Sequence, residues 1–217
     1  MKKILIVGTK SDLKKIFKSK SKNIIFIQNQ KKFSYEKVKK LNPKIIFFVY
    51  WHWKISSKIF KKYLCIGFHS SPLPYGRGGS PIQNMILKGN NFSKVCAIRV
   101  QEKLDSGDIY LKQNISLKGN LDDIWIKINK KIFFMIRKII KKIPTPQKQI
   151  GKVVFFKRLK PEQSLLFSKT SLKKIYDQIR MRDTKLNNIQ STFINYKNLK
   201  ISFKNAKYNK KEISCET

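Results

Sequence analysis

Acidic residues, histidines and cysteines are all scarce in this sequence. Its 217 residues include 12 Asp and Glu against 49 Lys and Arg, and only two His. Three isolated cysteines without a C-x-x-C pair argue against a disulfide framework or a zinc site and are typical of a reducing compartment. No apolar run approaches the roughly 20 residues of a membrane span, and the apolar N-terminus is too short for a signal peptide. We therefore expect a cytoplasmic protein without a metal and without a membrane segment.

The excess of positive charge does not by itself identify a partner. A formal net charge of +37 is typical of proteins that bind nucleic acid or anionic membranes. The basic residues are mostly Lys, however, and are scattered through every segment, whereas Arg occurs at six positions only. This distribution indicates a compositional bias and solvated lysine faces rather than a nucleic-acid-binding patch. The charge would still attract anionic substrates.

Short apolar runs alternate with helical patterns along the chain, and no G-x-G-x-x-G dinucleotide fingerprint follows the first run. Continuous apolar runs are typical of parallel strands buried on both faces. The alternation predicts right-handed βαβ units, and therefore an α/β fold with a mainly parallel sheet flanked by helices. The predicted strands are 4–7, 24–27, 45–50, 64–68, 95–100, 109–115 and 153–156. The predicted helices are 11–17, 34–41, 55–63, 80–89, 120–143 and 171–182.

A domain boundary is predicted near residue 165, within the linker-like segment 161–168. Residues 1–165 would form the α/β domain. Residues 166–217 would form a small α+β appendage, made of one helix and two β-like runs, 192–196 and 199–203, joined by a tight turn.

A loop rich in Gly and Pro, from Gly67 to Pro81, is the feature around which we interpret the rest of the sequence. The apolar run 64–68 leads into it, His69 stands at its entrance, and Ser80-Pro81 is a favourable helix start. Enzymes of the α/β class build their sites where strands run into such loops, at the carboxyl edge of the sheet. A histidine here could also be a capping or buried structural residue, but its position favours an active-site function.

Few side chains could act together with His69. An imidazole in acid–base catalysis usually needs a carboxylate to fix its tautomer, and Asp105 and Asp108 lie together in a turn between two predicted strands. Taken alone, this segment is better explained as an ordinary Asp-Gly hairpin turn. The second histidine, His52, stands between two tryptophans, and an aromatic packing cluster explains it as well as a pocket does.

Taken together, the loop and the turn resemble one known family. The segments H-S-S-P-L-P-Y-G-R-G-G-S-P-I-Q at 69–83 and L-D-S-G-D at 104–108 are similar to the folate-dependent formyltransferase family. Its pattern is Asn-x-His before an S-x-L-P-x-x-R-G loop, and then a distal D-x-G. The separation between His69 and Asp105 suits that family, and the tail beginning at Ile179 resembles its post-catalytic segment. Two motifs in register are far more specific than either alone.

The resemblance implies a fold, a donor and site residues. It implies a Rossmann-like domain without a dinucleotide, 10-formyltetrahydrofolate as formyl donor, and transfer to an amine. By matched position, His69 and Asp105 are the expected catalytic pair, with His69 managing the proton and the developing oxyanion. The residues expected to line the folate pocket are Tyr50, Trp51, His52, Trp53, Ile55 and Asp108. The residues expected in the substrate loop are Ser70, Ser71, Arg77, Gly78 and Gly79.

One position departs from the family pattern. The family's Asn falls at Gly67, which has no side chain. An oxyanion donor of this type is worth about 3 kcal/mol, or roughly 100-fold in rate. Either another donor replaces it, with His52, Asn84 and the loop backbone as candidates, or the activity is weakened or changed.

The acceptor is inferred from the tail and the loop. The tRNA-formylating relatives carry a substantial C-terminal RNA-binding barrel, and too little chain follows residue 165 for a full one. The short tail and the G-R-G-G-S-P loop therefore favour an amino-sugar nucleotide of surface-polysaccharide synthesis. The alternatives are a methionyl-tRNA formyltransferase-like enzyme, whose partner would be nucleic acid, and a folate- or nucleotide-binding homologue without catalysis. The sequence does not decide between a monomer and a homodimer.

Overall fold

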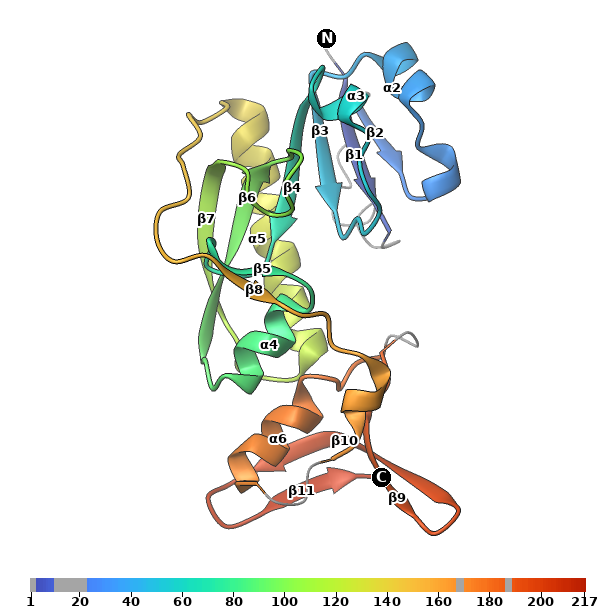
Figure 1. Cartoon of the computed structure of the whole chain (residues 1–217), viewed down its shortest axis with the longest axis vertical. Coiled ribbons are helices and arrows are strands. Elements are labelled where there is room, and N and C mark those ends of the chain that lie inside the picture. The colour runs from blue at the N-terminus through green and yellow to red at the C-terminus, as the bar shows by residue number, and fades with distance from the viewer. Residues whose placement is uncertain (1–2, 10–22, 167–169, 186–188) are drawn as a thin grey trace. The chain divides into compact units, whose positions relative to one another are not determined.

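The computed structural model describes residues 3–9, 23–166, 170–185 and 189–217 (Figure 1). Contacts within the chain divide it into two compact units. Unit 1 contains Met1–His69, Val95–Gln113 and Lys131–Lys152, and unit 2 contains Ser70–Lys94, Asn114–Lys130 and Val153–Thr217. The helix predicted at 11–17 lies outside the described residues. The boundary predicted near residue 165 stays a prediction.

A six-stranded sheet in the order β2-β1-β3-β4-β6-β7 forms the frame of unit 1. Its first four strands run parallel to their neighbours. They are β2 (Ile24–Ile27), β1 (Ile4–Gly8), β3 (Ile45–Val49) and β4 (Leu64–His69). The mainly parallel sheet flanked by helices that the sequence predicts is thereby confirmed (Figure 1).

The last two strands of the sheet are antiparallel. β6 (Phe92–Arg99) pairs antiparallel with β4, and β7 (Ile109–Ser116) follows it at the edge. The backbone bond from Arg99 N–H to Asp108 O closes one end of the β6–β7 pair, and that from Leu117 N–H to Asn91 O closes the other. The two strands are therefore the arms of a hairpin whose turn carries Asp105.

The continuous apolar runs explain the parallel strands, because all five residues of β3 are buried. Helices α2 (Tyr35–Leu41) and α3 (Ser57–Phe60) bury Val38 and Ile59 in the same cluster as residues of β1 and β3. Ser34 caps α2 as predicted, since its Oγ accepts the N–H of Lys37. α3 is shorter than the predicted 55–63, and the 3₁₀ turn η1 (Gln30–Lys32) is not anticipated by the sequence pattern.

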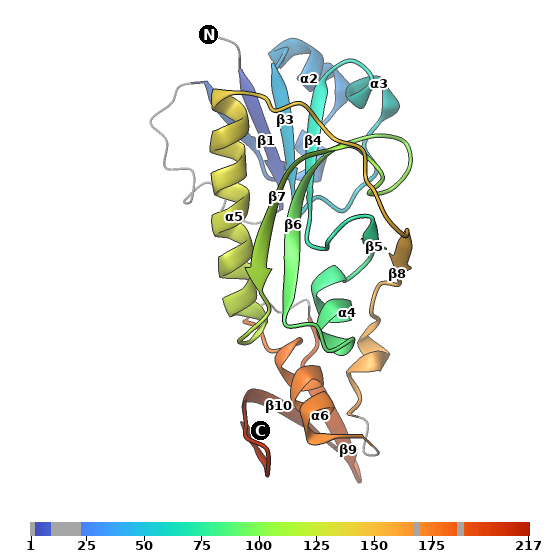
Figure 2. The same ribbon diagram turned by 90° about the vertical axis from the view of Figure 1, so that its left-hand side faces the viewer.

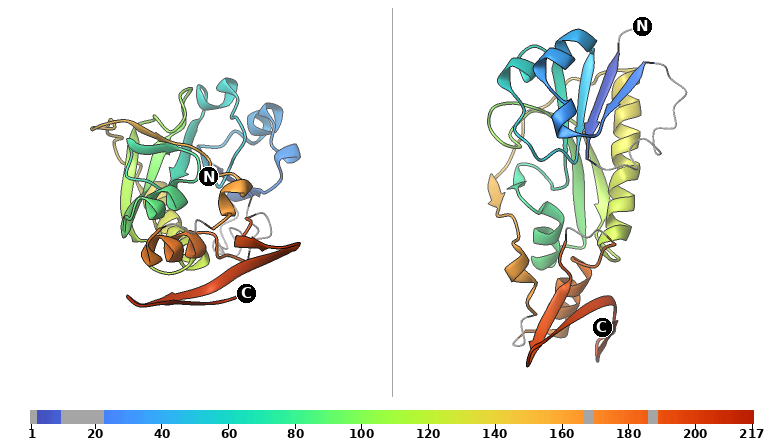
Figure 3. Two further views of the ribbon diagram at one scale, coloured as in Figure 1. Left: turned by 60° about the horizontal axis from the view of Figure 1, so that its bottom comes forward. Right: turned by 90° about the vertical axis from the view of Figure 1, so that its right-hand side faces the viewer.

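Helix α5 (Leu121–Lys141) carries the long apolar stripe expected from the sequence. Its N-terminus is fixed reciprocally: Asn120 Oδ1 accepts the N–H of Asp123, and Asp123 Oδ2 accepts the N–H of Asn120. Figures 2 and 3 show its second half, which belongs to unit 1, on the side of the parallel strands opposite α2 and α3. The buried stripe consists of Leu121, Ile124, Ile128, Ile132, Met135, Ile136 and Ile139. Within the described residues, none of the helices combines the length and the apolar character that crossing a membrane requires.

Unit 2 contains a small parallel sheet made of β5 (Tyr75–Gly78) and β8 (Val154–Phe156). Helix α4 (Pro81–Leu87) follows β5 in the sequence. β5 is not predicted, because its residues lack an apolar run. Ser80 is not the side-chain cap that the sequence predicts for α4. It adopts a left-handed conformation with φ 46°, and its Oγ accepts the N–H of Leu159 instead.

The C-terminal part of unit 2 has the predicted α+β content (Figure 1). It comprises η2 (Pro161–Ser164), α6 (Leu172–Arg180) and a three-stranded antiparallel sheet. The strands of this sheet are β9 (Thr192–Tyr196), β10 (Leu199–Tyr208) and β11 (Ile213–Glu216). The predicted hairpin corresponds to β9 and β10, whereas β11 adds a strand that the sequence pattern does not predict.

Candidate active site

The carboxyl ends of the parallel strands lie level with one another. Val7 pairs with Ile27 on one side and with Phe48 on the other. Phe48 in turn pairs with Gly67. These four residues form one row across the sheet, and the segments that follow them emerge at the same edge, where α/β proteins place their ligands. β4 ends two residues later, at His69.

His69 and Asp105 meet at this edge, although 105 − 69 = 36 positions separate them in the chain. His69 Nδ1 lies 3.4 Å from Asp105 Oδ2, slightly longer than an ordinary hydrogen bond and within ion-pair distance. His69 is only 7% exposed, and β4 pairs there with β6 in the sheet. Both residues belong to unit 1. The structure thus brings together the pair that the sequence singles out, while their catalytic roles stay predictions.

The turn that carries Asp105 is tightly built. Asp105 has a left-handed backbone with φ 49°. A Cβ placed on Gly107 would lie 1.7 Å from the carbonyl oxygen of Arg99, so only glycine fits there. Asp108, an expected folate-pocket residue, accepts the N–H of Arg99 through its backbone oxygen. Burial is the main reason that the pKa of Tyr110 is raised, and the nearby Asp108 carboxylate adds to it.

An aromatic cluster stands beside the carboxyl end of β3. Trp51 packs against Phe33, Phe48 and Trp53, with ring centroids at 5.3, 6.3 and 4.7 Å. Its indole N–H is buried and has no hydrogen-bond partner among the described residues. The ring centroid of His52 lies 6.4 Å from that of Trp53. This distance fits an aromatic packing cluster as well as a folate pocket.

Tyr50 and Ile55, the other residues of the segment 50–55 expected to line the folate pocket, also make contacts within unit 1. Tyr50 directly follows β3 with φ 54°, and its carbonyl oxygen accepts the hydroxyl hydrogen of Thr9 at 2.8 Å. Burial raises the pKa of Tyr50 well above its usual range, so the phenol stays neutral. Ile55 packs against the apolar cluster beneath the sheet.

In unit 2, the expected substrate loop is shaped by contacts with β8 and the residues after it. Gly78 has φ 100°, and a Cβ there would lie 2.5 Å from the carbonyl oxygen of Phe156. A Cβ on Gly79 would lie 2.6 Å from Arg158 Cα. Ser71 is fully buried, and its hydroxyl donates to the carbonyl oxygen of Gly76 at 3.0 Å. The glycines and Ser71 therefore have structural reasons for their positions, whereas Ser70 and Arg77 are only partly buried.

Asn84, one of the candidates to replace the family's Asn at position 67, is hydrogen-bonded to the backbone of the loop and of the segment after β8. Its Nδ2 donates to the carbonyl oxygens of Gly79, Ser80 and Lys157 at 3.0–3.1 Å. An amide nitrogen carries two hydrogens, so these bonds use its donor capacity. Asn84 is thus explained as a residue that holds the loop in shape.

Gln149 is a residue of the site region that the sequence interpretation misses. Its side-chain amide donates to the carbonyl oxygens of Asp105 and Gly107. A lone Gln in a polar segment carries no signal of its own. Only the pairing of that segment with the start of β7, between Gln147 and Ile109, reveals the contact.

Comparison with known proteins identifies the family. The family model described as formyl transferase matches residues 2–131, more than half of the chain. This chain belongs to the formyltransferase family. The resemblance derived from the loop and the turn is thereby confirmed. A second model, described as the C-terminal domain of methionyl-tRNA formyltransferase, matches residues 161–217.

Individual formyltransferases are similar to this chain to different degrees. A solved structure of methionyl-tRNA formyltransferase from Clostridium thermocellum is 38% identical, with a TM-score of 0.93 over 100% of this chain and 97% of that one. The methionyl-tRNA formyltransferase of Thermodesulfovibrio yellowstonii is 30% identical over 67% of this chain and 50% of its own length. The chain thus spans half or less of the curated relatives that it matches first. A 4-N formyltransferase structure from Francisella tularensis is 17% identical, with a TM-score of 0.71 over 94% of this chain and 96% of that one, and shares the fold.

Proposed function

We propose that this protein is a folate-dependent N-formyltransferase with His69 and Asp105 as its catalytic pair. The observation that carries the proposal is the 3.4 Å approach of Nδ1 of a buried histidine to a carboxylate at the carboxyl edge of the sheet. In the reaction, the acceptor nitrogen bonds to the formyl carbon, the bond from that carbon to the donor nitrogen breaks, and one proton passes from acceptor to donor nitrogen.

The geometry suits this proton transfer. Asp105 would hold the proton of His69 on Nδ1, so that Nε2 faces the acceptor amine and can receive its proton. The imidazolium formed in this way would also stabilise negative charge on the formyl oxygen. The acceptor amine must be neutral to attack, and a nearby base satisfies that requirement.

The segment Tyr50–Ile55 fits a bound folate. A pterin is a flat heteroaromatic ring with polar edges, and the cluster around Trp51 and Trp53 offers aromatic faces beside β3. The buried indole N–H of Trp51, which has no partner among the described residues, would be satisfied by an acceptor on such a ring. Bound folate would supply the formyl group. The described residues contain no cluster of His, Cys, Asp and Glu that could hold a metal ion.

For the acceptor we favour the amine of a methionyl-tRNA over that of an amino-sugar nucleotide. The support is the match of residues 161–217 to a methionyl-tRNA formyltransferase domain and the 38% identity to the Clostridium thermocellum enzyme. That chain is matched over 97% of its length, so a short tail does not argue against a tRNA acceptor. The sugar-modifying relative at 17% identity supports the fold alone.

The acceptor is tested by comparing the products of separate incubations. The protein is incubated with 10-formyltetrahydrofolate and either methionyl-tRNA or a panel of amino-sugar nucleotides, and products are identified by mass spectrometry. We expect formylmethionyl-tRNA. Formylated sugar nucleotide without a tRNA product would overturn the acceptor, and no product from any acceptor would overturn the transferase activity.

A variant separates catalysis from binding. His69→Ala should abolish formyl transfer, while a folate-dependent rise in the unfolding temperature persists. If wild-type protein shows the thermal shift without turnover, the protein is a folate-binding homologue rather than an enzyme.

A further inference from the structure

The turn that carries Asp105 is held by hydrogen bonds of its own and by contacts from outside it. Asp105 adopts a left-handed backbone conformation, which Asp tolerates better than most residues but at some cost relative to glycine. Gly107 passes so close to the backbone of Arg99 that no side chain fits. Contacts from the surrounding structure add to the definition of such a turn. The direction of the Asp105 side chain therefore depends on what anchors the turn.

Gln149 anchors this turn from outside it, whereas Gln101 Nε2 donates to Ser106 Oγ and Ser106 Oγ to the carbonyl oxygen of Lys103 within it. After helix α5 the chain returns beside the start of β7, where Gln147 and Ile109 form an antiparallel bridge with two backbone hydrogen bonds, of 2.8 and 3.0 Å. Two residues further on, this register places Gln149 opposite Gly107. Its Nε2 donates to the carbonyl oxygen of Asp105 at 2.8 Å and to that of Gly107 at 2.9 Å. Both hydrogens of the amide are therefore directed at the turn.

We propose that Gln149 is the positioning residue of the His69–Asp105 pair. Its amide fixes two carbonyl groups on either side of Ser106, and thereby the plane of the peptide that follows Asp105. That orientation aims the Asp105 carboxylate at Nδ1 of His69. Gln149 acts through Asp105 and contacts no reactant. The inference rests on the proposed function, because aiming the carboxylate matters for the reaction only if the pair is catalytic.

Gln147 provides a matched control. It is the same residue type two positions away, but its side chain is exposed and the bridge to Ile109 uses only its backbone. We expect Gln149→Met to lower kcat about 10-fold to 100-fold, a fraction of the contribution of general acid–base catalysis. The KM for 10-formyltetrahydrofolate should change less than about twofold, because Gln149 is not among the residues expected to line the folate pocket. Gln147→Met should behave like wild-type protein.

A spectroscopic measurement tests the inference without relying on activity. The chain has two histidines, so ¹⁵N-labelled histidine gives two sets of ring-nitrogen signals, which His52→Gln assigns. These signals report which ring nitrogen carries the proton. We expect His69 to carry it on Nδ1 in wild-type and Gln147→Met protein, and to populate both tautomers in Gln149→Met, with the His52 signals unchanged.

The outcomes separate the inference from the proposed function. Wild-type protein that transfers no formyl group would contradict the proposed function, while the His69 signals still test the anchor. Gln149→Met with wild-type His69 signals and wild-type kcat would overturn the inference. Equal losses in Gln149→Met and Gln147→Met would overturn it as well. If Gln149→Met does not fold, Gln149→Asn, whose amide is one methylene too short to reach both carbonyls, takes its place with the same expectations.

Discussion

Gly67 stands where the family pattern described in the sequence analysis has Asn, and the structure leaves room for a side chain at this position. Gly67 and His69 project toward the same face of β4, because they are two residues apart on a strand. A Cβ at Gly67 would meet only Val100 Cγ2, at 3.6 Å, which is ordinary van der Waals contact. Its backbone is extended within the strand, so a larger residue is not strained there.

We therefore expect Gly67→Asn to raise kcat, by roughly 10-fold to 100-fold, because it supplies an oxyanion donor beside His69. Single-turnover formyl transfer measures the effect, and Gly67→Ala is the matched control for bulk. An Asn variant no faster than the Ala variant would mean that another group already fills this role.

Cys65 makes stability depend on pH at the alkaline end. Burial raises the pKa of its thiol from about 9 to about 12, although Arg99 opposes the shift. The unfolded chain loses the thiol proton above pH 9 while the folded chain keeps it. The stabilisation is fully present below pH 9 and is lost as pH rises toward 12.

Urea unfolding of wild-type and Cys65→Ala protein between pH 8 and 11 tests this expectation. The wild-type free energy of unfolding should fall by a few kcal/mol more than that of the variant across this range, at roughly 1.4 kcal/mol per pH unit at most. Parallel pH profiles would show that the thiol is not the group responsible.

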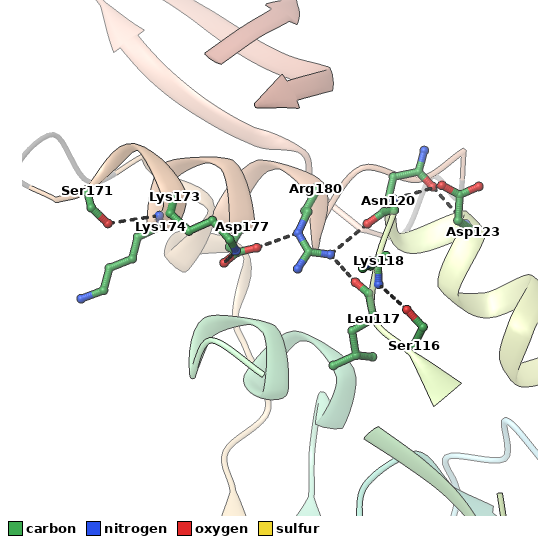
Figure 4. A network of polar contacts seen from close by, with 11 residues as sticks. Ser116, Leu117, Lys118, Asn120, Asp123, Ser171, Lys173, Lys174, Asp177 and Arg180 are labelled. Atoms are coloured by element: carbon green, nitrogen blue, oxygen red, sulfur yellow. Dashed lines mark hydrogen bonds and ion pairs between the residues drawn. The ribbon is translucent and has the colours of Figure 1, made fainter. Parts of the chain in front are cut away.

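Among the secondary-structure elements, α6 is tied to the segment before α5 by a buried arginine (Figure 4). Arg180, 5% exposed, donates from Nε to Asp177 Oδ1 at 2.6 Å. Its Nη1 donates to the carbonyl oxygens of Leu117 and Gly119. Asp177 is equally buried and also pairs with Lys173. One side chain thus satisfies a carboxylate and two carbonyl groups.

Replacing this arginine should be costly. We expect Arg180→Met to destabilise the protein by about 3–5 kcal/mol, because it leaves Asp177 buried with only a half-exposed lysine as partner. Adding Asp177→Leu should recover part of that loss, since the uncompensated charge is then gone. Denaturant unfolding of both variants provides the measurement. A double variant no more stable than the single one would contradict the explanation.

The elements that sequence reasoning predicts are those whose signal is local. β1 and β3 are continuous apolar runs, α2 has its cap at Ser34, and α5 carries a stripe at helical spacing. β5 is missed because its strand character comes from pairing with β8, which lies far along the chain. The cap predicted at Ser80 fails for a similar reason, since a distant backbone N–H, that of Leu159, takes its hydroxyl.

The same distinction holds for the site. His69 and Asp105 are found from sequence because each sits in a recognisable motif, and the sheet then brings them together. Gln149 is missed because its contact with the Asp105 turn depends on tertiary register alone. The sequence also suggests Asn84 as an oxyanion donor in place of the family's Asn. Its amide instead donates to three carbonyl groups, which only the folded loop brings near it.

At the scale of the whole molecule, net charge should govern stability. A formal charge of +37 on 217 residues opposes compaction through self-repulsion, which salt screens. We expect the midpoint of thermal unfolding to rise by about 5 °C between roughly 0.05 and 0.5 M sodium chloride, which corresponds to one or two kcal/mol. Scanning fluorimetry measures the midpoint, and sucrose at matched osmolality is the control. A midpoint that falls with salt would indicate that ion pairs outweigh repulsion.

The pairing of β5 with β8 also bears on how the protein is made. The glycine-rich loop around Gly78 packs against Phe156, and the Asp105 turn is held by Gln149. Both partners are synthesised long after the segments they support. At a synthesis rate of about 5–20 residues per second, a nascent chain spends several seconds with its sheet emerging and its loops still unsupported. Chains on ribosomes stalled before residue 149 should therefore lack a correctly oriented His69–Asp105 pair, even where the parallel strands have already formed.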